Sequence, residues 1–204
     1  TGWYTLSLHD ALPISPVRNQ QPAHGAAMKP IVMAITGASG AVYARRLAQA
    51  LVAADAHVHL VVSPHGQRVL ADELDLRTPD PAALLGAPTP AVTLHPYRDI
   101  GAVIASGSFP TAGMVICPCS SNTLAAVATG LADNLITRAA LVTLKEARRL
   151  VVVPREMPLG QIELANMLRL SQAGGVVCPA CPGFYLRPTS GEGDDERYQL
   201  NSGL

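Results

Sequence analysis

The stretch Ile31-Val32-Met33-Ala34-Ile35-Thr36-Gly37-Ala38-Ser39-Gly40 decides the fold class. It is a short, continuous apolar run that ends abruptly in a loop of small and hydroxyl residues. Such runs, rich in β-branched residues, are typical of strands buried on both faces of a parallel sheet. We therefore predict a strand over 31–35, a Gly/Ser turn over 36–40, and a helix after Ser39.

The same pattern recurs four more times along the chain. The later predicted strands are 57–62, a run ending at Cys117, 150–153 and 175–177, and each is followed by a polar loop. The predicted helices between them are one with Tyr43, Leu47, Ala50 and Leu51 on one stripe, 64–74, 122–129, 134–147, and one with Leu164, Met167 and Leu168 on one face. Strands that alternate with helices predict an α/β fold, a doubly wound parallel sheet in a Rossmann- or flavodoxin-like three-layer sandwich.

Composition excludes several classes of partner. The 204 residues carry 15 basic and 15 acidic side chains, so no charge excess favours nucleic acid or an anionic membrane. No apolar run approaches the roughly 18–20 residues that span a bilayer. No basic-then-apolar signal segment is present, so we expect a cytoplasmic protein.

The two ends of the chain differ from its middle. Residues 1–27 lack periodicity, and Thr5–Ser15 resemble a translated sequencing adapter, so we expect a non-native or disordered leader with Met28 as the start. We expect one flavoprotein-type domain over 28–190. Residues 191–204 are polar and acidic and carry no helical stripe, which predicts a disordered tail.

The four cysteines form two close pairs, Cys117 with Cys119 and Cys178 with Cys181. Four thiolates would suit zinc. We favour the alternative that the cysteines pack as small apolar residues, because a bound metal and its ligands would occupy the strand ends where ligands of such sheets bind. We therefore predict no metal site.

The Gly/Ser turn is suited to a phosphate or a ribityl chain. Glycine permits close backbone approach, and a helix N-terminus favours an anion. Short-chain dehydrogenases begin similarly, but their second strand ends in an acidic residue that holds ribose, and here it ends in Ser63. A Tyr-x-x-x-Lys pair is absent from the sequence, which also disfavours nicotinamide.

Two further loops carry chemistry. Ser120-Ser121-Asn122-Thr123 opens a helix and is either a phosphate-binding turn or an ordinary N-cap. Arg155-Glu156 lies between two prolines, and it offers a phosphate-binding guanidinium and an acid or base, or else a surface ion pair. Arg138 and Lys145 lie two helical turns apart on one face. Basic side chains near the strand ends, without a cluster of carboxylates that would hold a metal ion, predict a phosphate substrate bound without Mg²⁺.

Read in order, these motifs resemble the UbiX-type flavin prenyltransferases, long labelled aromatic-acid or polyprenyl-hydroxybenzoate carboxy-lyases, of the flavoprotein superfamily. The resemblance covers about residues 28–190. It rests on Thr36–Ala41, Ala105–Ser108, Pro118–Ser120 with Thr123, Arg138–Ala140, Leu144–Glu146, Pro154–Pro158, Glu163–Leu168 and Pro182–Tyr185 with Arg187-Pro188.

The resemblance implies transfer of a dimethylallyl group from dimethylallyl phosphate to N5 and C6 of reduced FMN, which makes the prenylated FMN cofactor of a UbiD-type decarboxylase. It implies a large homo-oligomer with sites at subunit contacts, and it leaves a monophosphate or a diphosphate donor open. The residues implied to bind FMN are Gly37, Ala38, Ser39, Ser63, Ser120, Ser121, Asn122, Thr123, Arg138 and Arg155. Those implied to bind the prenyl phosphate are Lys145, Arg155 and Tyr185. The implied catalytic groups are Glu156 as acid/base, Ser39 as its helper, Glu73 as a further pocket acid, and Lys145.

One departure from the family affects activity. The family's final helix brings a basic residue to the prenyl phosphate, but Gly191–Glu196 is acidic and lacks an apolar stripe. An impaired homologue or an FMN-binding carrier is therefore an alternative. A flavin-dependent cysteine decarboxylase would need a histidine on the first helix, and no histidine lies between Gly25 and Ala56.

Overall fold

The computed structural model describes residues 28–181 and contains a six-stranded, fully parallel sheet in the order β3-β2-β1-β4-β5-β6. The strands are β1 Ile31–Ile35, β2 Val58–Val62, β3 Val92–His95, β4 Gly113–Cys119, β5 Arg149–Pro154 and β6 Val176–Val177. The helices are α1 Ala41–Ala53, α2 Pro64–Leu74, α3 Pro81–Leu85, the 3₁₀ turn η2 Val103–Ala105, α4 Ser121–Thr129, α5 Leu135–Lys145 and α6 Gln161–Gln172. The predicted doubly wound α/β fold is confirmed.

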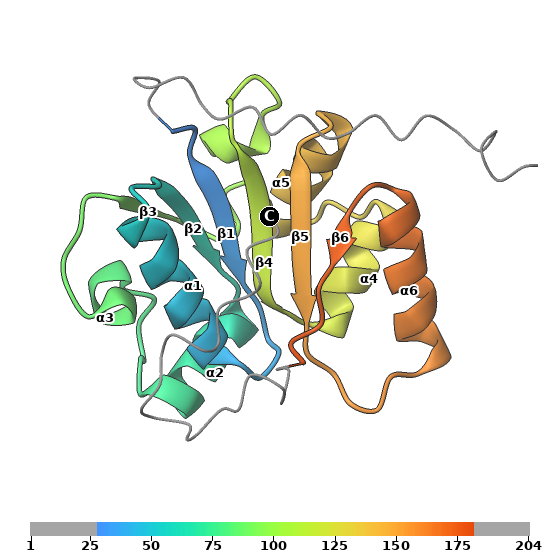
Figure 1. The fold of residues 1–204 in the computed structure, drawn as a ribbon, viewed down its shortest axis with the longest axis horizontal. Helices are drawn as coiled ribbons and strands as arrows, with labels where there is room; N and C mark the ends of the chain where they lie inside the picture. Colours follow the sequence, from blue (N-terminus) through green and yellow to red (C-terminus); the bar gives the residue numbers. More distant parts are fainter. Residues whose placement is uncertain (1–27, 182–204) are drawn as a thin grey trace, which may run out of the picture.

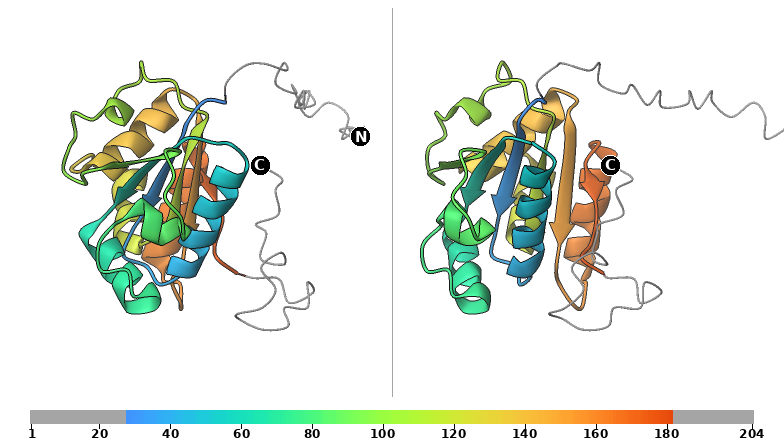
Figure 2. Two further views of the ribbon diagram at one scale, coloured as in Figure 1. Left: turned by 90° about the vertical axis from the view of Figure 1, so that its left-hand side faces the viewer. Right: turned by 60° about the vertical axis from the view of Figure 1, so that its left-hand side comes forward.

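Helices cover both faces of the sheet, which makes three layers (Figures 1 and 2). Alternate strand residues point to opposite faces, so the sheet has two apolar cores. Met33, Leu60 and Val62 pack toward α1, α2 and α3, whereas Val32, Ile116 and Val152 pack toward α4, α5 and α6. The strands therefore have to be apolar on both sides, which is why they appear as continuous runs in the sequence.

The sequence-based prediction missed β3 and α3. Both lie in the segment interpreted as a Pro-rich loop. β3 has four residues at the edge of the sheet, none of them fully buried, so it lacks a recognisable apolar run. α3 did carry readable signals: Asp80 caps its N-terminus, Pro81 is its first residue, and Gly86 ends it in the left-handed region.

Two predicted helix faces were wrong in detail. On α1 the predicted Tyr43, Leu47 and Leu51 pack against the core, but Ala50 is exposed. The fully buried residues are Ala41, Ala44 and Ala48, whose small side chains let the helix lie close to the sheet. On α6 Leu170 is the buried residue, whereas Leu164 and Leu168 are 52% and 60% exposed. The helix covers the two-residue edge strand β6, which offers little surface to bury a full apolar stripe.

The predicted leader 1–27 and tail 191–204 lie outside the described residues, and both stay predictions. None of the helices between residues 28 and 181 combines the length and the apolar character that crossing a bilayer requires.

Three histidines cluster where β2 and β3 pair. His59 Nδ1 lies 2.8 Å from His95 Nε2, and the His59 ring packs edge-on against those of His57 and Phe109. Burial, together with the charges that His95 and His57 would carry, lowers the pKa of His59 to about 4. Burial also lowers the pKa of His95, although Asp99 opposes that shift. The native chain therefore holds His59 neutral.

We expect the free energy of unfolding to fall as the pH drops from 6.5 to 4. In this window the unfolded chain takes up a proton on His59 and the native chain does not, so protonation favours unfolding. Urea unfolding across this pH range measures the slope, and a His59→Gln variant should have a shallower one. Equal slopes in the two proteins would contradict this assignment.

Candidate functional site

The strand order reverses between β1 and β4, and this is where ligands bind in open α/β sheets. From β1 the chain moves to β2 and β3 on one side, and from β4 to β5 and β6 on the other. The loops after β1 and β4 therefore diverge from the carboxyl edge of the sheet in opposite directions (Figure 1). These are the predicted turns 36–40 and 120–123.

Glycine lets the first turn approach α2 closely. A Cβ on Gly37 would lie 2.5 Å from the Cβ of His65, so a larger residue would push the turn away. Gly37 and Ser39 are exposed at the turn, whereas Ala38 is buried. The turn thus presents backbone atoms and the Ser39 hydroxyl to a ligand, while its other side packs against α2.

The N-terminus of α1 already binds an anion from the chain itself. The Glu73 carboxylate accepts hydrogen bonds from Gly40 N at 3.0 Å and from Ala41 N at 2.7 Å. Gly40, the N-cap residue, provides no side-chain cap. A phosphate at this helix end would have to displace Glu73, so the turn is better suited to an uncharged ribityl chain.

These contacts shift the pKa of the Glu73 carboxyl. Partial burial acts to raise its pKa, but hydrogen bonds from the Ser39 side chain, Ala41 N and Gly40 N outweigh burial, and the Arg155 charge adds to them. The pKa of Glu73 therefore lies below its usual value. Ser39, Glu73 and Arg155, which come from three different elements, are brought together here.

The serines after β2 and β4 are both helix caps. Ser63 Oγ accepts from Gly66 N at 2.9 Å, and Ser120 Oγ accepts from Thr123 N at 3.3 Å. The N-cap alternative for Ser120 is thus realised: Ser120 Oγ also donates to Thr123 Oγ1, and Asn122 is exposed at the start of α4. Asn122 and Thr123 also line a cavity of about 250 Å³ between α4, α5 and Tyr97.

Arg155 and Glu156 follow β5, and both are exposed. Within residues 28–181 they form no ion pair with each other, contrary to the surface-pair alternative. Glu156 Oε2 instead accepts a hydrogen bond of 3.3 Å from Ser121 Oγ, and its Oε1 accepts one from Met157 N. The acid/base candidate is thus held against the loop that follows β4.

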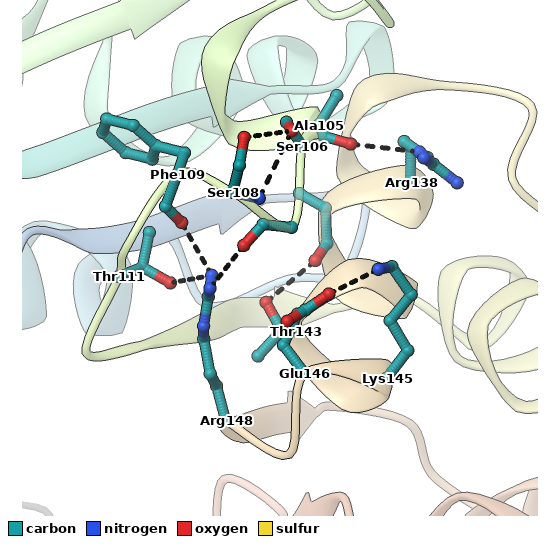
Figure 3. A network of polar contacts seen from close by, with 12 residues as sticks. Ala105, Ser106, Ser108, Phe109, Thr111, Arg138, Thr143, Lys145, Glu146 and Arg148 are labelled. Atoms are coloured by element: carbon teal, nitrogen blue, oxygen red, sulfur yellow. Dashed lines mark hydrogen bonds and ion pairs between the residues drawn. The ribbon is translucent and has the colours of Figure 1, made fainter.

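Arg138 and Lys145 lie elsewhere. Lys145 ends α5 four residues before β5 begins, which places it at the amino edge of the sheet, opposite Arg155 (Figure 1). There Lys145 Nζ pairs with Glu146, and Arg138 Nε donates to the Ala105 carbonyl (Figure 3). One chain therefore does not bring Lys145 to Arg155 or Glu156.

Arg148 organises that amino edge, and the sequence-based reasoning missed it. Its guanidinium donates to the carbonyls of Gly107 and Phe109, each at 2.7 Å (Figure 3). The loop over 105–109 is thereby fixed beside Lys145 and Glu146. A basic residue just before a strand was a visible signal, but its partners lie about 40 residues earlier in the chain.

Cys117, Cys119 and Cys178 pack among apolar residues, whereas Cys181 is exposed. Cys117 and Cys119 are buried, and burial raises the pKa of each thiol to about 12. All four thiols are free. Between residues 28 and 181 no three His, Cys, Asp or Glu side chains are arranged to hold a metal ion. Tyr185 lies outside the described residues, so its role stays a prediction.

Comparison with known proteins identifies the family of this chain. The flavoprotein family model matches residues 19–195. The chain belongs to that family. It is 48% identical over 170 residues to the flavin prenyltransferase UbiX of Pseudomonas aeruginosa, and the match covers 79% of this chain and 81% of the relative. It is also 48% identical over 158 residues to the flavin prenyltransferase UbiX of Halalkalibacterium halodurans, and that match covers 76% of this chain and 77% of the relative. The predicted resemblance to UbiX-type flavin prenyltransferases is confirmed.

Solved structures agree with these relatives. AnUbiX in complex with FMN and dimethylallyl pyrophosphate superposes with a TM-score of 0.74 at 41% identity, covering 81% of this chain and 85% of that one. A dodecameric FMN-dependent UbiX-like decarboxylase from Escherichia coli superposes with a TM-score of 0.72 at 42% identity, covering 79% and 84%.

We expect Glu73→Ala to lower the free energy of unfolding by about 0.5–2 kcal/mol, the usual cost of losing a cap. The loss should shrink at acidic pH, because a carboxylate with a depressed pKa contributes stability that disappears as pH falls through that pKa. Asp72→Ala is the matched control, since Asp72 makes only an exposed 3.5 Å ion pair with Arg68 on the same helix. Equal losses in the two variants at pH 7 would contradict the capping role.

Proposed function

We propose that this chain is a flavin prenyltransferase, which joins a dimethylallyl group to reduced FMN. The observation that carries the proposal is the convergence of Ser39, Arg155 and Glu156 at the crevice between β1 and β4, in a chain about half identical to flavin prenyltransferases. The chemistry supplied is alkylation at N5 and C6 of the flavin with departure of phosphate.

FMN lies across the carboxyl edge in this proposal. The exposed turn at Gly37 and Ser39 receives the ribityl chain, and the α4 start at Ser121 to Thr123 contacts the flavin from the other side of the crevice. Ala38 and the capping residues Ser63 and Ser120 shape these loops. Arg155 provides positive charge that Glu73 only partly neutralises.

Glu156 is the acid/base of the reaction. When the C–O bond of the donor breaks, the electron pair leaves with the phosphate, and the new N5–C bond releases the proton of flavin N5. The second bond then forms between flavin C6 and the tertiary carbon of the prenyl alkene, as the alkene takes up one proton and C6 releases its own. Glu156, held by Ser121, exchanges a proton with the leaving phosphate, and Ser39 assists. The Arg155 guanidinium stabilises the developing phosphate charge.

Lys145 and Arg138 act from a neighbouring copy. They lie at the amino edge of their own sheet, so a second chain has to bring them to Arg155 and Tyr185. The E. coli relative is dodecameric, and Leu164 and Leu168 on α6 expose apolar surface that a neighbour would cover. A homo-oligomer in the cytoplasm that passes prenylated FMN to a UbiD-type decarboxylase completes the proposal.

Product mass decides between enzyme and carrier. The protein is incubated anaerobically with reduced FMN and dimethylallyl phosphate, or with the diphosphate in a parallel sample. A flavin heavier by one prenyl group supports the enzyme. Bound but unmodified FMN supports the carrier, and loss of CO₂ from a cysteine-ended peptide supports the decarboxylase alternative.

We expect Glu156→Gln to slow prenyl transfer by ~10²–10⁴, the usual range for a positioned acid/base, while FMN affinity changes little. Single-turnover assays with saturating FMN measure the transfer step, and flavin fluorescence measures binding. Asp72→Asn, whose side chain forms only the exposed pair with Arg68 among the described residues, is the matched control. An unchanged transfer rate in Glu156→Gln would reduce Glu156 to an orienting residue.

We expect Lys145→Ala and Glu156→Gln chains to restore activity when they are unfolded together and reassembled. Each variant alone should be slow, but a mixed oligomer contains sites that take an intact Lys145 from one chain and an intact Glu156 from its neighbour. The comparison is transfer rate in mixed and separate samples at equal total protein. A mixture no faster than the average of the two separate samples would place Lys145 outside a shared site.

A further inference from the structure

Thr36 occupies the floor of the β1/β4 crevice. It is the first residue after β1 and is 1% exposed, so it touches no ligand in the open crevice. The pairing of β1 with β4 runs regularly from Ile31 with Gly113 to Ala34 with Ile116, and on the other side of β4 the pairing with β5 becomes irregular between Ile116 and Cys119. Thr36 lies just past the regular ladder.

The Thr36 side chain adds hydrogen bonds where the regular ladder ends. Pro118 has no N–H to donate, so the backbone pairing is broken at that residue. Thr36 Oγ1 donates to the Pro118 carbonyl at 2.9 Å and accepts from Ser120 N at 2.8 Å. Thr36 N donates to the same carbonyl at 3.1 Å. One buried hydroxyl thus ties the turn after β1 to the loop after β4.

The hydrogen bonds that begin at Thr36 continue to Glu156, the proposed acid/base. Ser120 caps α4, Ser121 is the first residue of that helix, and Ser121 Oγ donates to Glu156 Oε2. Because Thr36 holds the backbone N–H of Ser120, it places the start of α4 and thereby the hydroxyl that orients Glu156.

We propose that Thr36 is a positioning residue for prenyl transfer, which acts on Glu156 through Ser120 and Ser121. The inference rests on the proposed function. Position 36 has to provide a buried hydroxyl that donates and accepts at once. Valine has the same shape without the hydroxyl, and serine keeps the hydroxyl without the methyl group, so the two substitutions separate hydrogen bonding from packing.

The test measures FMN affinity and single-turnover prenyl transfer in wild type, Thr36→Val and Thr36→Ser. Displacing Ser121 should slow transfer in Thr36→Val by about 10- to 100-fold, the cost of misplacing a catalytic group by about 1 Å. Transfer in Thr36→Ser should stay within about threefold of wild type. Equal rates in wild type and Thr36→Val, or equal losses in the two variants, would overturn the proposal.

A double-mutant cycle tests the route. In a Ser121→Ala background, Thr36→Val should have little further effect, whereas independent full losses would overturn the relay through Ser121. If Thr36→Val does not fold, Thr36→Ala takes its place in the same comparison. A wild-type chain that binds FMN but makes no prenylated flavin overturns the proposed function. The tie between the loops is then judged by FMN affinity, which Thr36→Val must weaken more than Thr36→Ser.

Discussion

The parallel pairing of β1 with β4 is the interaction on which the rest of this structure depends. It places two strands side by side whose following helices, α1 and α4, cover opposite faces of the sheet. The two loops must part at the carboxyl edge, and the crevice between them is left without a covering helix. The residues of one chain that we propose to contact flavin at the carboxyl edge lie beside that crevice: Gly37, Ser39, Ser121 to Thr123 and Arg155.

Internal anion binding shapes the crevice further. The N-terminus of α1 carries partial positive charge, and Glu73 from α2 neutralises it. The same carboxylate binds Ser39 and feels the charge of Arg155. A helix end that would otherwise attract phosphate is therefore satisfied, and in the proposed function the arginines and Lys145 bind the phosphate instead.

The separation of charges between the two sheet edges gives assembly a chemical reason. Arg155 and Glu156 lie at the carboxyl edge, while Lys145, Arg138 and the loop that Arg148 holds lie at the amino edge. Parallel strands keep these edges about a strand length apart within one chain. Only a contact between copies can join them, which accords with the dodecameric relative.

The sequence alone determined the fold class and most of the loops that form the site. Apolar runs such as 31–35 and 150–153 are buried on both faces, so burial forces a pattern that can be read without coordinates. The edge strand β3 is only partly buried, and nothing in its sequence had to be strongly apolar. Its position was therefore not predictable from periodicity.

Tertiary structure decided which functional groups meet. The contact of Glu73 with Gly40 spans 33 residues, that of Thr36 with Ser120 spans 84, and that of Ser121 with Glu156 spans 35. Sequence motifs marked Glu73, Ser121 and Glu156 as site residues, but not that Glu73 caps α1 or that Thr36 ties two loops. Such pairings depend on strand order and register, which chain proximity does not encode. For the same reason, the sequence motif predicts Lys145 as a site residue but not its position. Within one chain Lys145 lies at the amino edge of the sheet, opposite Arg155 and Glu156.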